Sequence, residues 1–396
     1  MNFAGIKKIL VIKLRHIGDV LLAVPVFRAL KETFPDAHIT ALVNSGTEDV
    51  LKGNPLIDEI LIVDRSIKRL SPIRRYAKEI AFLKNIRGNG FDMTVDLTGG
   101  DRAAIISLIS GARYRISMKS EKGFLGKKHL ITHIAEVDGR RHTVMQNLEV
   151  VSQYGISTKN LSIDFYIPEK DRIFIKRIIK ENNTEENDIV VHVHPTSRWL
   201  FKCWKDEYMA WVIKWLLDSG TTVIVTSSPD RREVEKARRI LSLVGDSPDS
   251  TASPVNLGQS PHGSRLIDLC GKTTIKQLGA ISAASDLFFG VDSAPMHIAA
   301  AVGTPVVALF GPSGAFNWGP WDNKISNFKF QISNLENPYP NKNGIQTFGM
   351  HTVIQRNWEC IPCGKDGCNG SKISKCLEDI KSAEIKDILI KRLKTQ

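Results

Sequence analysis

The sequence lacks the features that would place the protein in a membrane or outside the cell. No apolar run approaches the roughly 18 residues that a membrane span needs. The N-terminus alternates Lys and Arg with apolar residues, which is typical of a first strand and not of a signal peptide. Repeats and low-complexity tracts are also missing. We therefore expect a cytoplasmic protein whose six cysteines are reduced unless they bind metal.

Three motifs of nucleotide and diphosphate chemistry are absent as well. There is no Walker loop G-x-x-x-x-G-K-[ST], and no G-x-G-x-x-G follows the first predicted strand, which disfavours a dinucleotide-dependent dehydrogenase. No Asp-x-Asp pair is present, so the usual carboxylate clamp for a metal-bridged diphosphate is missing. A diphosphate would have to be neutralised by helix N–H groups and by Lys or Arg. We expect no cofactor.

The composition indicates a folded, basic protein. Its 396 residues are enough for two domains of ordinary size, and 42% hydrophobic residues supply a sizeable core. The formal net charge is +12 and the pI is near 9.3. This charge favours an anionic partner, such as nucleic acid, a phosphorylated lipid or a nucleotide. A basic surface could also visit an anionic membrane face.

One stretch, residues 285–314, organises the rest of the chain. It reads SDLFFGVDSAPMHIAAAVGTPVVALFGPSG, with apolar runs at 287–291 and 306–310 that are typical of buried parallel strands. Between them, Asp292 and Ser293 are N-cap residue types, and Pro295 suits a first helical turn. The free N–H groups of that helix would form an anion site at the carboxyl edge of the sheet.

An ordinary βαβ crossover explains this stretch about as well as a ligand site does. The next turn, Gly311-Pro312-Ser313-Gly314, favours the ligand site, because it adds a second small-residue loop at the edge where open α/β sheets bind ligands. His297 could donate a hydrogen bond to phosphate there. A lone His is, however, more often packed or capping than catalytic.

Strands and helices alternate in both halves of the chain, which predicts an α/β fold of two doubly wound, Rossmann-like domains. We expect the domains at residues 1–168 and 188–396, facing each other across a cleft. The charged segment 169–187 is predicted to form a helix and a turn with little to bury, and it is interpreted as the linker. The basic segment 65–87 has apolar residues at helical spacing, so we interpret it as a solvated helix. The Pro/Gly/Ser-rich segment 245–260 predicts a surface loop.

Asp19 is the candidate acid/base residue. It follows the first predicted strand, at the start of an amphipathic helix and at the carboxyl edge of the sheet. An Asp in that position is also a common N-cap, a role worth about 1 kcal/mol. The pattern alone slightly favours the cap.

Polar loops follow two strands of the second half. Thr196, Ser197 and Lys202 come after the strand at 189–193, where hydroxyls and a Lys suit phosphate oxygens; a solvated loop with a packed aromatic is the alternative. Asp230 and Glu233 follow the next strand and could accept ribose hydroxyls. Capping and solvated charge explain either acid more simply.

The last cysteines form a cluster with the spacing C-x2-C-x4-C-x7-C. Four thiolates could bind Zn²⁺ tetrahedrally, although the spacing departs from that of zinc ribbons. A disulfide and unmodified thiols remain open alternatives. The cluster consists of Cys360, Cys363, Cys368 and Cys376.

Together these residues resemble glycosyltransferase family 9, the bacterial lipopolysaccharide heptosyltransferases. The resemblance covers nearly the whole chain, and the tail at 360–377 is most similar to the heptosyltransferase III branch. The motifs that carry it are Gly18-Asp19-Val20 with Pro25, Asp96-Leu97, His194-Pro195-Thr196-Ser197 with Lys202 and Trp204, and Asp292-Ser293-Ala294-Pro295-Met296-His297 with Gly311-Pro312.

The resemblance implies a GT-B fold and an inverting transfer from ADP-L-glycero-β-D-manno-heptose. The N-terminal domain would hold the acceptor and supply Asp19 as the base. The C-terminal domain would bind the donor: Thr196, Ser197 and Lys202 at the diphosphate, and the turn from Asp292 to His297, which includes Ser293, Ala294, Pro295 and Met296, at the sugar and phosphate. Lys202 would also stabilise the departing ADP, and Glu233 or Asp230 would hold the ribose.

The implied acceptor is the phosphorylated lipid A-core at the inner membrane face, so the enzyme could be peripheral to that membrane. A sugar-nucleotide epimerase of the same fold is the first alternative. A non-catalytic protein that binds nucleotide sugar or nucleic acid is the second. Nucleic acid is not expected as a partner, because the basic residues are scattered and form no aromatic-interleaved stripe.

Overall fold

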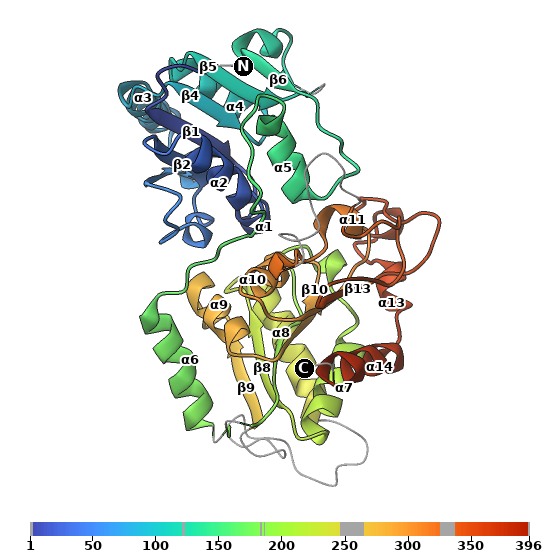
Figure 1. Ribbon diagram of the computed structural model, residues 1–396. Coiled ribbons are helices and arrows are strands. Elements are labelled where there is room, and N and C mark those ends of the chain that lie inside the picture. Colours follow the sequence, from blue (N-terminus) through green and yellow to red (C-terminus); the bar gives the residue numbers. More distant parts are fainter. Residues whose placement is uncertain are drawn as a thin grey trace. The chain divides into compact units, whose positions relative to one another are not determined.

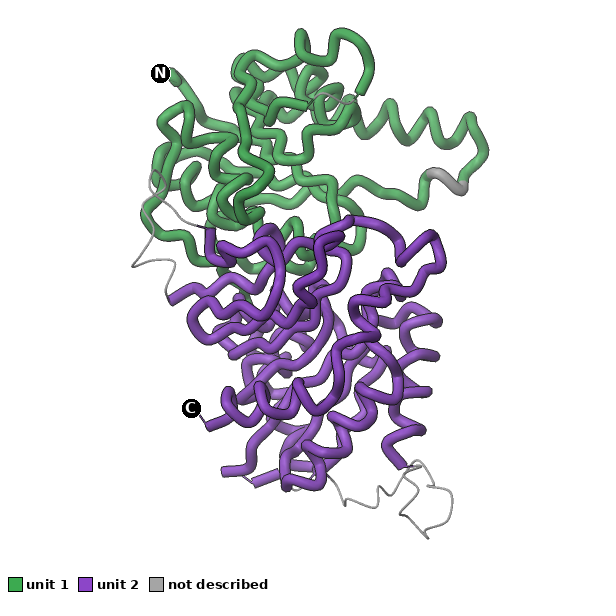
Figure 2. Tube along the Cα trace, turned by 90° about the vertical axis from the view of Figure 1, so that its right-hand side faces the viewer, with its two compact units in different colours: residues 1–166, 326–335 green, residues 167–325, 336–396 purple. Residues whose placement is uncertain are grey.

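The fold is described here from a computed structural model. It describes residues 3–120, 123–182, 184–185, 187–245, 265–324 and 337–394. These residues form two compact units, one up to Tyr166 and one from Ile167 onward (Figure 2). Within the described residues, no helix combines the length and the apolar character needed to cross a membrane. The expected loop at 246–260 lies outside the described residues.

The first unit is a parallel sheet with helices on both faces (Figure 1). The strand order is β3-β2-β1-β4-β5-β6, and every neighbouring pair is parallel. Both faces of the central strand are covered, and residues 9–12 are fully buried, which is why the strand reads as a continuous apolar run. The strands are β1 (Lys8–Lys13), β2 (His38–Asn44), β3 (Glu59–Val63), β4 (Met93–Asp96), β5 (Tyr114–Met118) and β6 (His133–Ala135).

Helices α3 and α4 pack together, as do α2 and α5, and the two pairs cover opposite faces of the sheet. Leu10 and Ile12 of β1 pack in one cluster with Ile86 of α3 and Ile106 of α4. Side chains alternate along a strand, so Lys13 of β1 points to the opposite face of the sheet, where it donates a hydrogen bond to Asn147 of α5. The helices are α1 (Ile17–Leu21), α2 (Val24–Thr33), α3 (Pro72–Gly88), α4 (Asp101–Ile109) and α5 (Thr143–Ser152), with 3-10 turns η1 (Glu48–Val50), η2 (Arg65–Arg69) and η3 (Lys127–Leu130).

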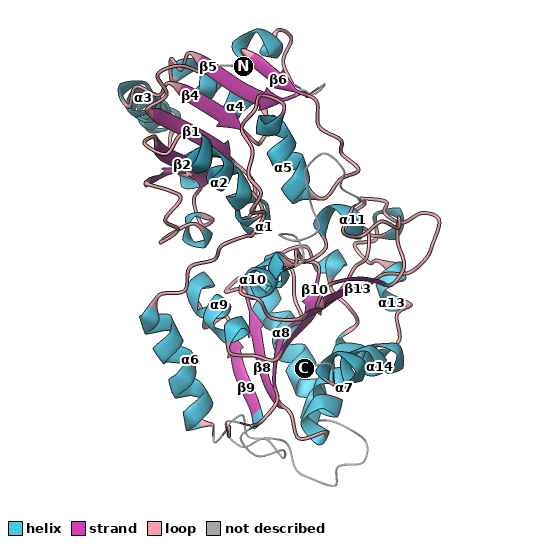
Figure 3. Cartoon of the chain, in the orientation of Figure 1, coloured by secondary structure: helices cyan, strands magenta, loops and turns pink. Residues whose placement is uncertain are grey.

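The second unit is built in the same way around a seven-stranded sheet (Figure 3). Its order is β12-β13-β11-β10-β7-β8-β9, with only the β12–β13 pair antiparallel among the described strands. The predicted strand at 287–291 is confirmed as β10, which pairs with β7 and β11. The strands are β7 (Val190–His194), β8 (Thr222–Ser227), β9 (Leu266–Cys270), β10 (Leu287–Val291), β11 (Val306–Leu309), β12 (Gln346–Phe348) and β13 (His351–Ile354).

The helices of the second unit also form two layers. Helices α7, α8 and α14 lie over one face, and α6, α9 and α10 lie over the other. The bounds are α6 (Glu169–Glu181), α7 (Asp206–Asp218), α8 (Arg231–Gly245), α9 (Ile275–Ala283), α10 (Ala294–Ala301), α11 (Ala315–Trp318), α13 (Lys375–Glu378) and α14 (Ser382–Leu393), with 3-10 turns η4 (Leu200–Lys202) and η6 (Cys368–Gly370).

Each sheet has one point at which the chain order reverses. In the first unit the reversal lies between β1 and β4, and in the second it lies between β7 and β10. Ligands of open α/β sheets bind outside the carboxyl ends of the strands at such a point, because the loops on either side diverge there. Asp19 follows β1, while Lys202 follows β7 and Asp292 follows β10. The topology therefore places the candidate residues at the two reversal points.

The expected linker differs from the structure. Residues Glu169–Glu181 form helix α6, which belongs to the second unit and packs beside α9. Ile175 of this helix is buried, whereas Ile173 is 57% exposed. Because this helix buries only a narrow strip of residues, most of its sequence is charged. A solvated linker has a similar composition, which explains the difference.

Candidate functional site

Asp19 lies inside helix α1 and does not cap it. The N-cap is His16, so Asp19 occupies the third helical position. Its carboxylate is half-buried and accepts no hydrogen bond from the residues that the structure describes. The N-cap alternative is therefore wrong for this residue. A carboxylate that accepts no hydrogen bond from the described residues, at a sheet reversal point, remains available to a ligand.

A buried lysine lies behind Asp19. Lys13 Nζ donates to Leu97 O at 2.9 Å and to Asn147 Oδ1 at 2.8 Å, which ties β1 to β4 and α5. Burial lowers the pKa of Lys13 to about 8, and the negative charges of Asp19 and Asp96 oppose that shift. The sequence analysis did not single out Lys13. The feature that could have pointed to Lys13 is that it is the only charged residue in the apolar run at 9–14.

Asp96 is the last residue of β4, the strand next to β1. Its carboxylate accepts from the backbone N–H groups of Thr98 and Gly99 at 2.7 and 3.1 Å and from Ser117 Oγ at 2.9 Å. Burial nevertheless raises the pKa of Asp96. With both oxygens occupied, Asp96 shapes the turn after β4 and leaves Asp19 as the open carboxylate.

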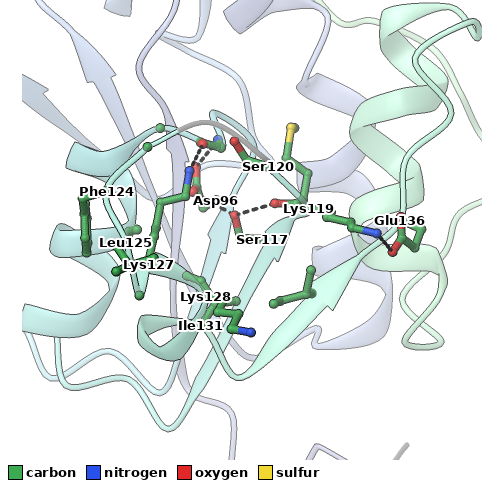
Figure 4. A pocket seen from close by; sticks show the side chains of 17 residues that line it. Asp96, Ser117, Lys119, Ser120, Phe124, Leu125, Lys127, Lys128, Ile131 and Glu136 are labelled. Atoms are coloured by element: carbon green, nitrogen blue, oxygen red, sulfur yellow. Dashed lines mark hydrogen bonds and ion pairs between the residues drawn. The ribbon is translucent and has the colours of Figure 1, made fainter.

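Two cavities open at the carboxyl ends of the first sheet. One, of about 560 Å³, lies over β4, β5 and β6 between Lys127, Lys128 and the apolar side chains of Phe124 and Leu125 (Figure 4). The other, of about 580 Å³, adjoins α1 through His16 and is lined by four arginines and by the three carboxylates of Asp64, Glu79 and Asp101. Its cationic lining residues are Arg15, Arg65, Arg75 and Arg102.

The reversal point of the second unit carries an ion pair. Lys202 Nζ lies 2.7 Å from Asp292 Oδ2, and Asp292 is only 6% exposed. These residues are 90 positions apart in the sequence and meet because β7 and β10 are neighbours in the sheet. The structure thus brings together the two loops that the sequence analysis singled out separately.

A buried carboxylate joins the loops after β7 and β8. Glu233 is 4% exposed and accepts from Thr196 Oγ1 at 2.9 Å and from Ser228 Oγ at 2.5 Å. Asp230 is exposed at the surface and pairs with Arg232. Of the two acids considered for ribose, Glu233 is the one that lies against the candidate phosphate loop.

Helix α10 presents only part of its predicted binding turn. Ser293 is the N-cap, and Ser293, Ala294 and Pro295 are partly exposed. Ser293 Oγ is buried and has no hydrogen-bond partner among the described residues. Met296 is fully buried and His297 is 5% exposed, so both belong to the packed side of the helix. The exposed first turn is therefore the part that a ligand can reach.

The C-terminal tail is hydrogen-bonded to the loop after β7 and to the loop after β11. Ser374 Oγ donates to Phe201 O at 2.6 Å, and Trp204 Nε1 donates to Ile380 O at 3.1 Å. The backbone N–H of Gly364 donates to Pro312 O at 2.9 Å. Sequence reasoning missed these contacts, because nothing in the local pattern reveals which loop a distant tail will meet.

The tail cysteines are free thiols in different surroundings. Cys360 and Cys363 are exposed, Cys368 is half-buried and Cys376 is buried, with its pKa raised by burial to about 11. In the part of the chain that the structure describes, no three His, Cys, Asp or Glu side chains are gathered closely enough to hold a metal ion. The zinc site stays a prediction.

Thiol titration separates the alternatives for the tail. Because the thiolate is the reactive form, we expect Cys360 and Cys363 to react fast with a disulfide reagent at pH 8 and Cys376 to react only after unfolding. The measurement is the burst amplitude, about two thiols for the described geometry. A missing burst together with one equivalent of zinc per chain would establish the metal site instead.

Two buried histidines make the second unit sensitive to acid. His192 and His194 on β7 both contact Thr226 Oγ1, at 2.7 and 2.8 Å. Burial lowers the pKa of His194 to about 3, and that of His192 well below its usual value. The unfolded chain takes up these protons near pH 6.5, so stability is intact above that pH and is lost progressively below it, toward pH 3.

We therefore expect the free energy of unfolding to fall by roughly 2 kcal/mol per buried histidine between pH 7.5 and pH 5. Urea unfolding at the two pH values measures it. An unchanged midpoint with an unchanged slope would show that these histidines are not held neutral.

The model of one protein family matches residues 80–343, and its description is glycosyltransferase family 9 (heptosyltransferase). The chain belongs to glycosyltransferase family 9. Lipopolysaccharide heptosyltransferase 3 of Escherichia coli is 31% identical over 318 residues, which cover 80% of this chain and 86% of that protein. The core heptosyltransferase OpsX of Haemophilus influenzae is 23% identical over 317 residues, or 80% of this chain and 82% of that protein.

Solved family 9 structures share the fold over nearly the whole chain. A family 9 glycosyl transferase from Veillonella parvula matches with a TM-score of 0.73 at 20% identity, covering 98% of both chains. The E. coli ADP-heptose heptosyltransferase II matches with a TM-score of 0.71 at 18% identity, covering 98% of this chain and 99% of that one. The predicted GT-B fold of two Rossmann-like domains is confirmed.

Proposed function

We propose that this family 9 enzyme transfers L-glycero-D-manno-heptose from ADP-heptose to the inner core of lipopolysaccharide, with inversion at the anomeric carbon. The observation that carries the proposal is the 31% identity to a lipopolysaccharide heptosyltransferase over 80% of the chain. A related E. coli heptosyltransferase, 16% identical with a TM-score of 0.65 and covering 97% of this chain and 99% of that one, has been solved with ADP.

Asp19 is the proposed base. An inverting displacement needs one group that takes the proton of the acceptor hydroxyl on the face opposite the leaving group. Asp19 fits because its carboxylate is partly open and has no hydrogen bond to give up. The acceptor sugar and its anionic groups would occupy the neighbouring cavity, where Arg15, Arg65 and Arg75 supply positive charge.

The second unit would bind the donor. Lys202 is the proposed counter-charge for the diphosphate, helped by the N–H groups at the start of α10 and by the hydroxyls of Thr196 and Ser197. In the structure Asp292 holds Lys202 in place at 2.7 Å. As ADP departs, negative charge grows on the phosphate oxygen, and a preorganised ammonium group stabilises that charge more than it stabilises bound substrate.

Glu233 is proposed to hold the ribose of ADP. Its two oxygens each keep a lone pair beyond the hydroxyls that they accept from Thr196 and Ser228. This arrangement couples nucleoside binding to the loop that carries Ser197. The exposed turn from Ser293 to Pro295 would contact the heptose and the phosphate nearest to it.

Turnover should not need a divalent metal ion. The chain has no Asp-x-Asp clamp, and Lys202 with helix α10 supplies the positive charge at the diphosphate. We expect the transfer rate in excess EDTA to stay within about twofold of the untreated rate. An activity that disappears in EDTA and returns with Mg²⁺ or Mn²⁺ would contradict this assignment of Lys202.

The implied site of action is the cytoplasmic face of the inner membrane, where a phosphorylated lipid A-core would present its sugars. No nucleic acid takes part. Incubation of ADP-heptose with and without a truncated core lipid tests the reaction class. We expect free ADP and a lengthened lipid only when the acceptor is present. An isomerised nucleotide sugar formed from the donor alone would identify an epimerase and overturn the proposal.

A further inference from the structure

Helix α3 and the turn before it form the most basic segment of the chain. Residues 65–88 contain one acidic residue, Glu79, whose carboxylate is paired with Arg102 at 2.8 Å. The turn and the helix connect β3 to β4, and Figure 1 shows α3 at the outer edge of the first unit. The segment's eight cations are Arg65, Lys68, Arg69, Arg74, Arg75, Lys78, Lys84 and Arg87.

The N-terminal half of α3 is exposed on all sides. Ile86 is the one residue of this helix that is fully buried among its described side chains, and Phe82 and Leu83 pack partly against the same core. The helix is therefore anchored by its last turns. Every residue from Ser71 to Lys78 is exposed, so the first turns of the helix extend into solvent.

Three large apolar side chains lie on this free half. Ile73 is 84% exposed, Tyr76 is 68% exposed and Ile80 is 54% exposed. Their spacing of three and four residues puts them on one face of the helix. Arg74 and Lys78 flank them and form no ion pair with any residue that the structure describes. Exposed apolar residues bordered by polar ones are typical of an interaction surface, and the flanking cations make this surface attractive to an anionic partner.

We propose that this face of α3, from Ile73 to Ile80, docks the enzyme on an anionic phospholipid surface. The helix would lie in the plane of the interface, with the two isoleucines among the headgroups and acyl ends, and with Arg74 and Lys78 against lipid phosphates. Binding to nucleic acid phosphates depends on Lys and Arg, whereas a lipid interface also buries apolar side chains, so the apolar strip favours a membrane over nucleic acid. The proposed function, with its lipid-linked acceptor, explains why the enzyme would bind a membrane, but the docking face itself is inferred from the exposed residues of α3.

The test is sedimentation of the full-length protein with vesicles. We expect wild type to bind vesicles of phosphatidylglycerol mixed with phosphatidylcholine and not vesicles of phosphatidylcholine alone. The double variant Ile73→Ser/Ile80→Ser should bind at least about tenfold more weakly, because two inserted side chains are lost. Arg74→Gln/Lys78→Gln should weaken binding by about fivefold per charge and flatten its salt dependence.

A matched control comes from α6 of the other unit. Ile173 is 57% exposed beside Arg172 and Lys176, and Ile173→Ser should leave vesicle binding unchanged. All the variants should elongate a delipidated, water-soluble core oligosaccharide at the wild-type rate, which shows that they are folded.

If Ile73→Ser/Ile80→Ser binds anionic vesicles as tightly as the wild type does, the proposed docking face is wrong. It is also wrong if the wild-type protein does not bind anionic vesicles. Binding to random duplex oligonucleotides in preference to vesicles would replace the membrane with nucleic acid. These vesicles contain no acceptor, so their result is independent of transfer. Protein that binds them but elongates no acceptor would count against the proposed function alone.

Discussion

The variant Asp19→Asn should bind ADP-heptose normally, unfold near the wild-type temperature and lose transfer by about 10²–10⁴-fold. Asn has nearly the shape of Asp but cannot take a proton at neutral pH. Because Asp19 makes no capping hydrogen bond, the exchange removes no contact from helix α1. The cost in stability should be limited to the favourable interaction of the carboxylate with the helix dipole, about 0.3–1 kcal/mol.

Isothermal titration with ADP-heptose and the rate of transfer to a core lipid form the paired measurement. Asp49→Asn is a suitable control, because Asp49 also lies in the first turn of a helix, η1, at the same edge of the sheet. That exchange should leave the rate within about twofold of wild type, as expected for a surface charge. A near-normal rate in Asp19→Asn with intact donor binding would remove Asp19 from the chemistry.

The second large effect is expected for Lys202→Ala. Loss of a charged hydrogen bond to the diphosphate is worth roughly 1.5–3 kcal/mol, so kcat/KM should fall by about 10- to 150-fold and ADP should bind more weakly. The structure adds a complication, since Lys202 also neutralises Asp292, which is 6% exposed. The single variant would leave that carboxylate buried without a partner and should also be less stable.

A double variant separates the two effects of Lys202. In Lys202→Ala/Asp292→Asn the uncompensated charge is gone, so thermal stability should recover, whereas kcat/KM should stay low because the diphosphate still lacks its counter-charge. The melting temperature and the kcat/KM of the wild type, the single variant and the double variant form the measurement. Full recovery of kcat/KM in the double variant would show that Lys202 serves only to neutralise Asp292.

The core strands could be predicted because a run of consecutive apolar residues is enough to indicate a strand that is buried on both faces. Residues 287–291 are apolar on both faces, and the structure finds strand β10 there. The meeting of Lys202 with Asp292 could not be predicted, since it depends on β7 and β10 being neighbours across a reversal in strand order. Residue patterns along the chain do not encode that order, which long-range packing decides.

The helix starts show the limit of capping rules. Asp19 has the residue type of an N-cap, yet α1 begins two residues earlier, at Ile17, with His16 as its cap. The helix at 169–181 was predicted, but a single buried strip around Ile175 is too weak a pattern to show that this helix packs in the second unit and does not link two domains. In both cases tertiary contacts override local preference.

A donor panel is the decisive test of heptose transfer from ADP-heptose. The purified enzyme is incubated in turn with ADP-heptose, other ADP-sugars and UDP-sugars, each with a truncated core lipid as the acceptor. The mass of the lipid is then measured by mass spectrometry. We expect that only ADP-heptose adds one heptose residue to the lipid and releases ADP. Equal or faster transfer from a UDP-sugar, or no gain in lipid mass with any donor, would contradict it.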